Sequence, residues 1–184
     1  MAGSPLLTGI DIGSSAVRIV VGQSVPREHG VQDLTILGAV EVPSQGISKG
    51  SVTSIDDAVA SISKCLEHAE RMTGHPIQSA WVGIGGTHII AQESKGVIGV
   101  ARNDGEVREE DVERAIEAAR TVATPSNHEI LHVIPKTFTV DGQRGVKDPV
   151  GMTGIRLEVD ALIVQGRTSQ IKNLTKGVYR NGLN

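Results

Sequence analysis

The 184-residue sequence predicts an α/β fold, and three observations support this prediction. Hydrophobic residues make up 39% of the chain but aromatic residues only 2%, so the core consists of aliphatic side chains, with the Val and Ile content that favours sheets. Stretches of strand character alternate with stretches of helical spacing. The length exceeds that of a typical single domain, which indicates one large or two small domains.

The first part of the chain predicts three strands and a helix. Residues 6–13 and 16–22 flank the turn "GSSA", and residues 34–42 form a third strand, which gives a three-stranded meander. The stretch "SIDDAVASISKCLEHAERMTG" is a helix with Ser54 as N-cap and Gly74 at its end. Cys65 lies on its apolar face, which indicates a core residue rather than a reactive thiol. That face comprises Ile55, Ala58, Val59, Ile62, Leu66, Ala69 and Met72.

The middle of the chain predicts further strands and a second helix. Residues 79–86 form a strand, and residues 88–101 form a strand or a hairpin interrupted at Gly96. Residues 108–123 form an amphipathic helix whose acidic first turn, "REED", suits the positive end of the helix dipole. We expect this acidic run to be a solvated face. The apolar face of the helix contains Val112, Ala115, Ile116, Ala119 and Val122.

The last part predicts a strand at 127–143 around Pro135, a loop at 144–154, a long strand at 155–166 and a helix at 168–182. The helix turns Ile171, Leu174 and Val178 inward and ends at Gly182. Because strands and helices alternate up to this point, a chain that stops after a cleanly terminated helix is typical of an excised piece of a larger fold.

Charge and cysteine content exclude several classes of function. The net charge is −3, and Lys and Arg are scattered, so nucleic acid or an anionic membrane is not expected as the main partner. The only cysteine cannot form an internal disulfide, and the N-terminus lacks the features of a signal peptide, which together predict a cytosolic location. No apolar stretch approaches the roughly 20 residues that span a bilayer.

The turn "DIGSSA" is the strongest candidate for a binding site. Strand alternation places Ile10 and Ile12 on one face and aims the Asp11 carboxylate away from the core. Gly13 permits a positive φ and the close approach of a ligand. Backbone N–H groups at such a turn bind anions, and a neighbouring carboxylate suits a phosphate-bound Mg²⁺. The hydroxyls of Ser14 and Ser15 add donors, and Arg18 can cover a phosphate charge. An ordinary hairpin with a polar turn explains these residues equally well.

Other motifs predict no chemistry. "GIGGTH" lacks the third glycine of a dinucleotide motif and precedes strand-like rather than helical sequence. His128 and His132 lie in a predicted strand, where their spacing does not bring two metal ligands together. No arrangement of Ser, His and Asp or of Cys and His indicates a nucleophile, so catalytic residues stay unassigned.

Five segments together resemble the FtsA family of bacterial cell-division proteins, which are actin-like ATPases. The most specific is "HVIPKTFTVDGQRGVKDPVGMTGIRLE", because the first turn alone occurs across the actin, Hsp70 and sugar-kinase superfamily. The resemblance covers nearly the whole chain. The remaining segments are "GIDIGSSAVRIVVG", "GISKGSVTSIDDAVASISKCLEHAE", "WVGIGGTHI" and "IKNLTKGVYRNGL".

The resemblance implies an α/β fold of the actin/Hsp70-like, ribonuclease-H type, incomplete here, with an inserted α+β SHS2-type subdomain. Residues 1–78 and 163–184 would belong to the first actin-like subdomain, and residues 79–162 to the insert. In the family the first turn binds the β- and γ-phosphates of ATP with Mg²⁺. This role carries over to Asp11, Gly13, Ser14 and Ser15, with Arg18 in a position that is often basic and Asp11 holding Mg²⁺ through water.

The family binds ATP with weak ATPase activity, polymerises, recruits later division proteins and links FtsZ filaments to the inner face of the cytoplasmic membrane at the division site. The resemblance implies these partners for a full-length protein, with self-association and recruitment through the insert. The family's second phosphate turn, adenosine loop and C-terminal membrane helix have no counterpart in these 184 residues. We therefore expect half of an ATP site, with feeble or no binding and no catalysis by the chain alone.

Three alternatives remain open at this stage. The chain resembles, less closely, an actin-like pilus-assembly scaffold with a similar insert, although the loop "DGQRGVKDPVGMTG" favours the division family. A sugar-kinase-type phosphotransferase of the same superfamily would share the first turn, but few substrate-binding polar and aromatic residues follow the hairpin. A stand-alone interaction module that never turns over nucleotide is the third.

Overall fold

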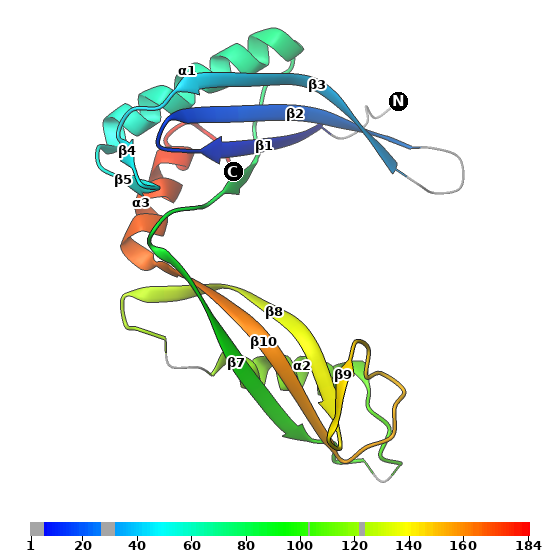
Figure 1. The fold of residues 1–184 in the computed structure, drawn as a ribbon. Helices are drawn as coiled ribbons and strands as arrows, with labels where there is room; N and C mark the ends of the chain where they lie inside the picture. The colour runs from blue at the N-terminus through cyan, green and yellow to red at the C-terminus, as the bar shows by residue number, and fades with distance from the viewer. Residues whose placement is uncertain (1–5, 27–31, 103, 122–123) are drawn as a thin grey trace. The chain divides into compact units, whose positions relative to one another are not determined.

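The computed structural model describes residues 6–26, 32–102, 104–121 and 124–184, and the chain divides into two compact units (Figure 1). The first unit contains residues 1–88 and 169–184, and the second contains residues 89–168. The strand at residues 81–83 thus falls in the first unit, whereas the resemblance assigned it to the insert. Val122, expected on a helix face, lies outside the described residues.

A four-stranded sheet forms the centre of the first unit. Its order is β3 (Gln32–Pro43), β2 (Ala16–Pro26), β1 (Leu6–Ile12) and β6 (Trp81–Gly83). β1, β2 and β3 form the predicted antiparallel meander, and β6 pairs parallel with β1. A two-residue turn joins the short strands β4 (Ile47–Ser48) and β5 (Ser51–Val52).

The helix α1 (Ile55–Thr73) covers one face of this sheet. Its ends are those that the sequence predicts: the Ser54 hydroxyl accepts from the N–H of Asp57, and Gly74, at φ 72°, donates its N–H to the Glu70 carbonyl. Cys65 is buried, as expected, and its Sγ lies 3.4 Å from the Val17 carbonyl oxygen. Met72 was expected in the core, but the residue is 57% exposed.

The helix α3 (Thr168–Tyr179) completes the first unit from residue 169 onward. It ends earlier than the predicted residue 182. Val178 and Leu183 join the same hydrophobic core as Ile62 on α1. The Arg180 guanidinium lies 2.8 Å from the Asp56 carboxylate, which further fixes this end of the chain to α1.

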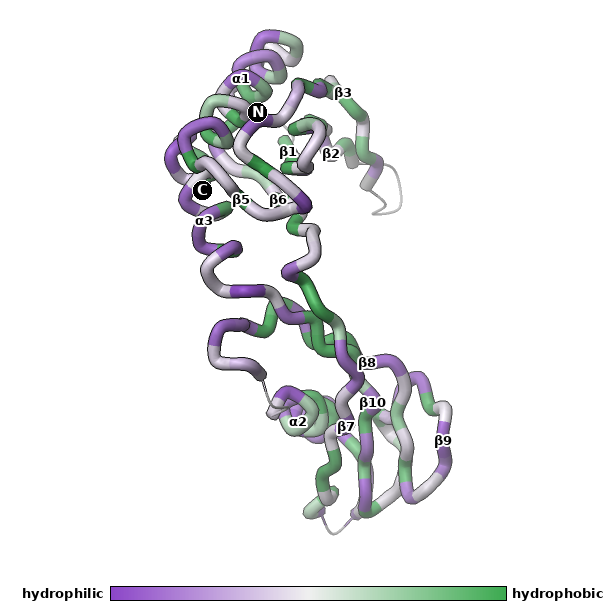
Figure 2. The backbone as a smooth tube through the Cα atoms, turned by 60° about the vertical axis from the view of Figure 1, so that its left-hand side comes forward, coloured by the Kyte–Doolittle hydropathy of each residue, from purple (hydrophilic) through white to green (hydrophobic). Residues whose placement is uncertain are grey.

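The second unit is a four-stranded antiparallel sheet with one helix. The strand order is β7 (Ile89–Gly99), β10 (Arg156–Arg167), β8 (His128–Val140) and β9 (Gln143–Val146), and α2 (Glu109–Arg120) packs on the sheet. Hydrophobic and hydrophilic residues alternate along β10, as Figure 2 shows, and the inward residues Leu157, Val159, Ala161 and Ile163 are buried in the core.

Two predictions for this unit were wrong. β7 is continuous through Gly96, so the glycine does not interrupt the strand. Instead it makes room for the helix, because a Cβ at this position would lie 2.0 Å from the Ala115 carbonyl oxygen of α2. The expected loop from residue 144 begins with three residues of β9, which pairs with the end of β8. Pro135 is accommodated where the register between β8 and β10 shifts.

Candidate functional site

The turn between β1 and β2 lies at the carboxyl end of two parallel strands. β1 ends at Ile12 and β6 at Gly83, and Asp11 and Gly83 are register partners. In α/β sheets, ligands bind outside the carboxyl ends of such strands. As predicted, Ile10 and Ile12 are buried and Asp11 is exposed. The structure therefore brings the Asp11 carboxylate to a sheet edge of the kind that binds ligands.

Hydrogen bonds hold the turn at both ends. The N–H of Gly13 donates to the Ala16 carbonyl at 3.0 Å, and the Ser15 carbonyl accepts from the N–H of Ser44 at 3.1 Å. The side chains of Ser14 and Ser15 are exposed. Gly13 does not use the positive φ that a glycine permits. A side chain is nonetheless disfavoured there, because a Cβ would lie 3.0 Å from the Ala16 carbonyl oxygen.

Arg18 connects two carboxylates across three strands. It is the register partner of Asp11 on β1 and of Glu41 on β3. Its guanidinium lies 3.1 Å from the Asp11 carboxylate and 2.7 Å from that of Glu41. The hydrogen bonds to Glu41 and Asp11 raise the pKa of Arg18 above its ordinary value. The cation that the sequence assigned to a phosphate is thus already shared between two carboxylates, one of which is itself a candidate ligand.

A second loop, which the sequence analysis did not assign to the site, meets the turn from the β4–β5 hairpin. The N–H of Gly50 donates to the Ser14 hydroxyl at 3.0 Å. Gly50 in turn packs against Gly85 and Gly86, which follow β6. The signal was present as "SKGS", a two-residue hairpin turn ending in glycine, but nothing in the local sequence shows that this turn lies beside Ser14.

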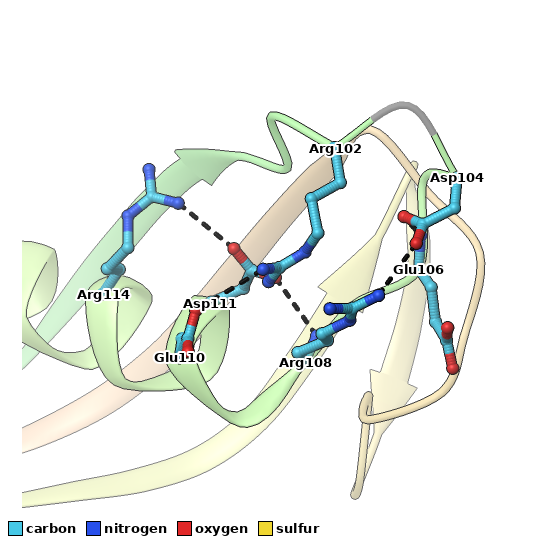
Figure 3. A network of polar contacts seen from close by, with 7 residues as sticks. All are labelled: Arg102, Asp104, Glu106, Arg108, Glu110, Asp111 and Arg114. Atoms are coloured by element: carbon cyan, nitrogen blue, oxygen red, sulfur yellow. Dashed lines mark hydrogen bonds and ion pairs between the residues drawn. The ribbon is translucent and has the colours of Figure 1, made fainter.

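A separate polar cluster lies at the start of α2 in the second unit (Figure 3). Asp111 is buried, and its carboxylate accepts from Arg102, from Arg114 at 3.1 Å and from the N–H of Arg108 at 3.1 Å. The expectation of a solvated acidic face was therefore wrong for Asp111. Its carboxylate satisfies the helix N-terminus and pairs with arginines, which is the usual condition for burying a charge.

No group of three or more His, Cys, Asp or Glu side chains gathers as a metal site within the described ranges. A magnesium ion in a nucleotide site needs only one or two carboxylates, because phosphate oxygens and water supply the other ligands. The exposed Asp11 carboxylate fits that requirement. Among the described helices, none is long and apolar enough to cross a membrane.

Comparison with known proteins identifies relatives along the entire chain. Residues 86–165 match the family model "SHS2 domain inserted in FTSA". The chain is 39% identical to cell division protein FtsA of Bacillus subtilis (strain 168) over 183 residues, which is 100% of this chain and 40% of that protein. It is 33% identical to FtsA of Escherichia coli (strain K12), over 97% of this chain and 41% of that protein.

A solved structure shares the fold at low sequence identity. The chain superposes on a chain of the PilM–PilN type IV pilus biogenesis complex with a TM-score of 0.60 and 13% identity, covering 96% of this chain and 45% of the other. Together with the SHS2 match, this likeness supports the predicted fold class, an α/β actin-like subdomain with an SHS2-type insert. The chain spans about 40% of the length of the FtsA proteins that it matches. With this identity along its whole length, the chain matches one part of the FtsA proteins throughout, the part that carries the SHS2 domain.

Proposed function

We propose that this chain forms one wall of an ATP site in an actin-like cell-division protein, with the β1–β2 turn holding the β- and γ-phosphates. The single observation that supports this most directly is the position of Asp11, Gly13 and Ser14 at the carboxyl ends of the parallel strands β1 and β6. Phosphates favour such turns because backbone N–H groups converge there.

Each residue of the turn has a distinct role in this proposal. Asp11 holds Mg²⁺ through water, the role that a single exposed carboxylate can fill. The hydroxyls of Ser14 and Ser15 donate to phosphate oxygens, and the absence of a side chain at Gly13 lets the phosphate approach the backbone. Arg18 keeps the Asp11 carboxylate in place through its contact at 3.1 Å.

The wider cellular role is proposed from the relatives, which are named cell division proteins. We propose that the protein self-associates through the second unit, which coincides with most of the SHS2 match. We further propose that, as part of a full-length protein at the inner face of the cytoplasmic membrane, it links FtsZ filaments to that membrane through a C-terminal helix outside these residues. The FtsA identities of 33% and 39% favour this role over the pilus-assembly alternative, because the sequence identity to the chain of the PilM–PilN complex is 13%.

Nuclear magnetic resonance titration of the complete 184-residue chain with Mg-ATP tests the phosphate site. One wall of a site binds weakly, so we expect amide shifts at Gly13, Ser14 and Ser15 with a dissociation constant of about 1 mM or above. Asp11→Asn should weaken Mg-ATP binding at least about threefold. Glu67→Gln, at an exposed carboxylate on α1, is the matched control and should leave binding unchanged.

Two results would contradict the proposal. If the amide resonances of the β1–β2 turn do not shift at a large excess of Mg-ATP, the proposed phosphate site is refuted. Calorimetry that showed micromolar binding would show that these residues form a whole site rather than one wall.

A chimera tests the cellular role. The matched segment of Bacillus subtilis FtsA is replaced by this chain, and division is followed in cells that depend on the chimera. We expect septa to form, and the Asp11→Asn chimera to form fewer. A stably expressed chimera that yields only filamentous, undivided cells would count against the proposed role, with the Glu67→Gln chimera as the control for expression.

A further inference from the structure

The β4–β5 turn has an unusual residue at a conformationally demanding position. Lys49 and Gly50 are its two central residues, and both have positive φ, 50° and 75°. A two-residue hairpin turn with positive φ at both positions favours Asn, Asp or Gly at the first position, because other side chains are strained there. Lysine is not one of these residues, so the turn retains a conformational cost.

The chain contains a second turn of the same kind that follows the usual preference. Between β8 and β9, Asp141 and Gly142 have φ values of 44° and 89°. The Asp141 carboxylate accepts from the backbone N–H groups of Ile155, at 3.1 Å, and Arg156, at 2.8 Å, so this side chain stabilises its surroundings. An ammonium group cannot accept such bonds. The Lys49 side chain therefore does not stabilise its turn in the way that Asp141 does. Residues held in strained backbone conformations cluster at functional sites.

Contacts on two sides fix the position of Lys49. The next residue, Gly50, donates its N–H to the Ser14 hydroxyl at 3.0 Å. On the other side, the Lys49 carbonyl accepts from the N–H of Thr87 at 3.4 Å, and a Cβ on Gly50 would lie 2.1 Å from the Gly85 carbonyl oxygen. The turn is thus held between the β1–β2 turn and the loop after β6, with the lysine side chain exposed.

The contact from Gly50 also determines what the Ser14 hydroxyl can do. A hydroxyl has one hydrogen to donate and two lone pairs to accept with. Because the N–H of Gly50 occupies a lone pair, the hydrogen is available to a ligand. At the same time the guanidinium of Arg18, on β2 beside the β1–β2 turn, is shared between Asp11 and Glu41, so its positive charge is largely compensated. A polyphosphate needs a further positive charge, and Lys49 is adjacent in sequence to the residue that touches Ser14.

We propose that Lys49 is an additional phosphate-binding residue and that the Gly50 N–H positions the Ser14 hydroxyl to donate to the same phosphate. This inference rests on the proposed ATP site and adds a second loop to it. The ligand chemistry is that of a nucleoside polyphosphate, with the ammonium group binding the phosphates rather than the base or the ribose.

Three variants at and near this turn separate charge from folding. Lys49→Asn removes the charge and introduces a residue that tolerates the positive φ of this position, so the midpoint temperature of unfolding should stay the same or rise. Lys49→Arg keeps the charge. Lys64→Gln removes a charge from an exposed position on α1 and serves as the matched control. Affinity is measured by amide titration of the complete chain with Mg-ATP and, separately, with Mg-triphosphate, which lacks the nucleoside.

We expect Lys49→Asn to weaken binding of both probes about three- to tenfold at low salt, and the difference to shrink as ionic strength rises. Lys49→Arg and Lys64→Gln should bind as the unaltered chain does. The amide resonance of Gly50 should shift on titration with either ligand, and Ser14→Ala should abolish most of that shift.

The outcomes distinguish this inference from the function on which it rests. If Asp11→Asn weakens binding but Lys49→Asn does not, the phosphate site stands and the role of Lys49 is refuted. Equal losses in Lys49→Asn and Lys49→Arg would also refute it, because charge would not be the cause. If the unaltered chain shows no shift at the β1–β2 turn, the proposed function fails first.

Discussion

The guanidinium of Arg102 and the carboxylate of Asp111 form an ion pair at the N-terminus of α2, with a nitrogen to oxygen distance of 2.5 Å. The Asp111 side chain is 3% exposed and that of Arg102 is 27% exposed. The pair joins the segment after β7 to the first turn of the helix. Because a buried charge that loses its partner is costly, this contact makes the attachment of α2 sensitive to a single substitution.

Asp111→Asn should destabilise the second unit by about 2 kcal/mol. The neutral amide has one acceptor oxygen in place of two, so it cannot accept hydrogen bonds from Arg102, Arg114 and the N–H of Arg108 as the carboxylate does. Hydrogen exchange of the complete chain, followed by mass spectrometry, should show faster exchange in α2 and β10 and unchanged exchange in α1. Glu117→Gln, at an exposed carboxylate 3.5 Å from Arg120, is the control and should leave exchange in α2 as it is. Unchanged protection in Asp111→Asn would show that the pair contributes nothing net.

The same carboxylate should make the second unit sensitive to acid. Burial raises the pKa of Asp111, but the hydrogen bonds from the Arg108 N–H and the Arg102 guanidinium outweigh it and hold that pKa below its ordinary value. A group whose pKa is lower in the folded state stabilises the fold above its unfolded pKa, about 3.9. This stabilisation should be complete at neutral pH and lost as the pH falls from about 4 through the folded value.

The measurement is hydrogen exchange of α2 at several pH values, corrected for the intrinsic exchange rate. The difference in protection between the unaltered chain and Asp111→Asn should narrow as the pH falls through this range. A constant difference down to the lowest pH at which the chain stays folded would contradict the assignment to Asp111.

Gly96→Ala should disrupt the packing of α2 on β7. The added Cβ would lie 2.0 Å from the Ala115 carbonyl oxygen and 2.6 Å from the Ala119 nitrogen, so the helix backbone must move. We expect a loss of about 3 kcal/mol, measured as a lower urea midpoint for the exchange protection of the second unit. Gly99→Ala in the same strand is the control, since its Cβ would meet only the Ile155 carbonyl oxygen at 3.9 Å. Similar losses in both variants would point to strand propensity instead of helix contact.

Cys65 should be unreactive in the folded chain. The thiol is buried between α1 and the sheet, and burial raises its pKa, although backbone contacts of Ile19 and Val42 partly oppose this. Since the thiolate is the reactive form, a disulfide reagent at pH 8 should label Cys65 only as fast as the first unit opens. Lys64→Cys, at the exposed neighbouring position, should react at once at its new thiol. Rapid labelling of Cys65 without loss of helicity would contradict its burial.

Local signals in the sequence were sufficient for much of the first unit. Ser54 and Gly74 mark the ends of α1 because capping depends on residues within one helical turn. The alternation of Ile10, Asp11 and Ile12 predicted the exposure of Asp11, because the face on which a strand residue lies also depends on its immediate neighbours. Met72 has the right helical spacing but is 57% exposed, because spacing predicts which face a residue lies on and not how far along the helix the sheet extends.

The errors concern contacts between distant segments. Gly96 has the sequence signature of a strand break, and only the approach of α2 explains it. Asp111 belongs to an acidic run that is typical of a solvated helix face, and its burial depends on Arg102, nine residues earlier. The contact between Gly50 and Ser14 joins residues 36 positions apart. Neither propensity nor periodicity contains information of this kind, so the β4–β5 turn beside Ser14 stayed outside the sequence-based prediction.

The pairing of Ile89 with Gly166 has a consequence for the architecture as a whole. These residues open β7 and nearly close β10, so the polypeptide enters and leaves the second unit at antiparallel partners whose Cα atoms lie within about 5.5 Å of each other. A unit attached in this way behaves as a cassette. We expect that it can be excised, with a tight turn joining the flanking residues, or exchanged for another module, without a change in the strand order of the sheet that holds the β1–β2 turn.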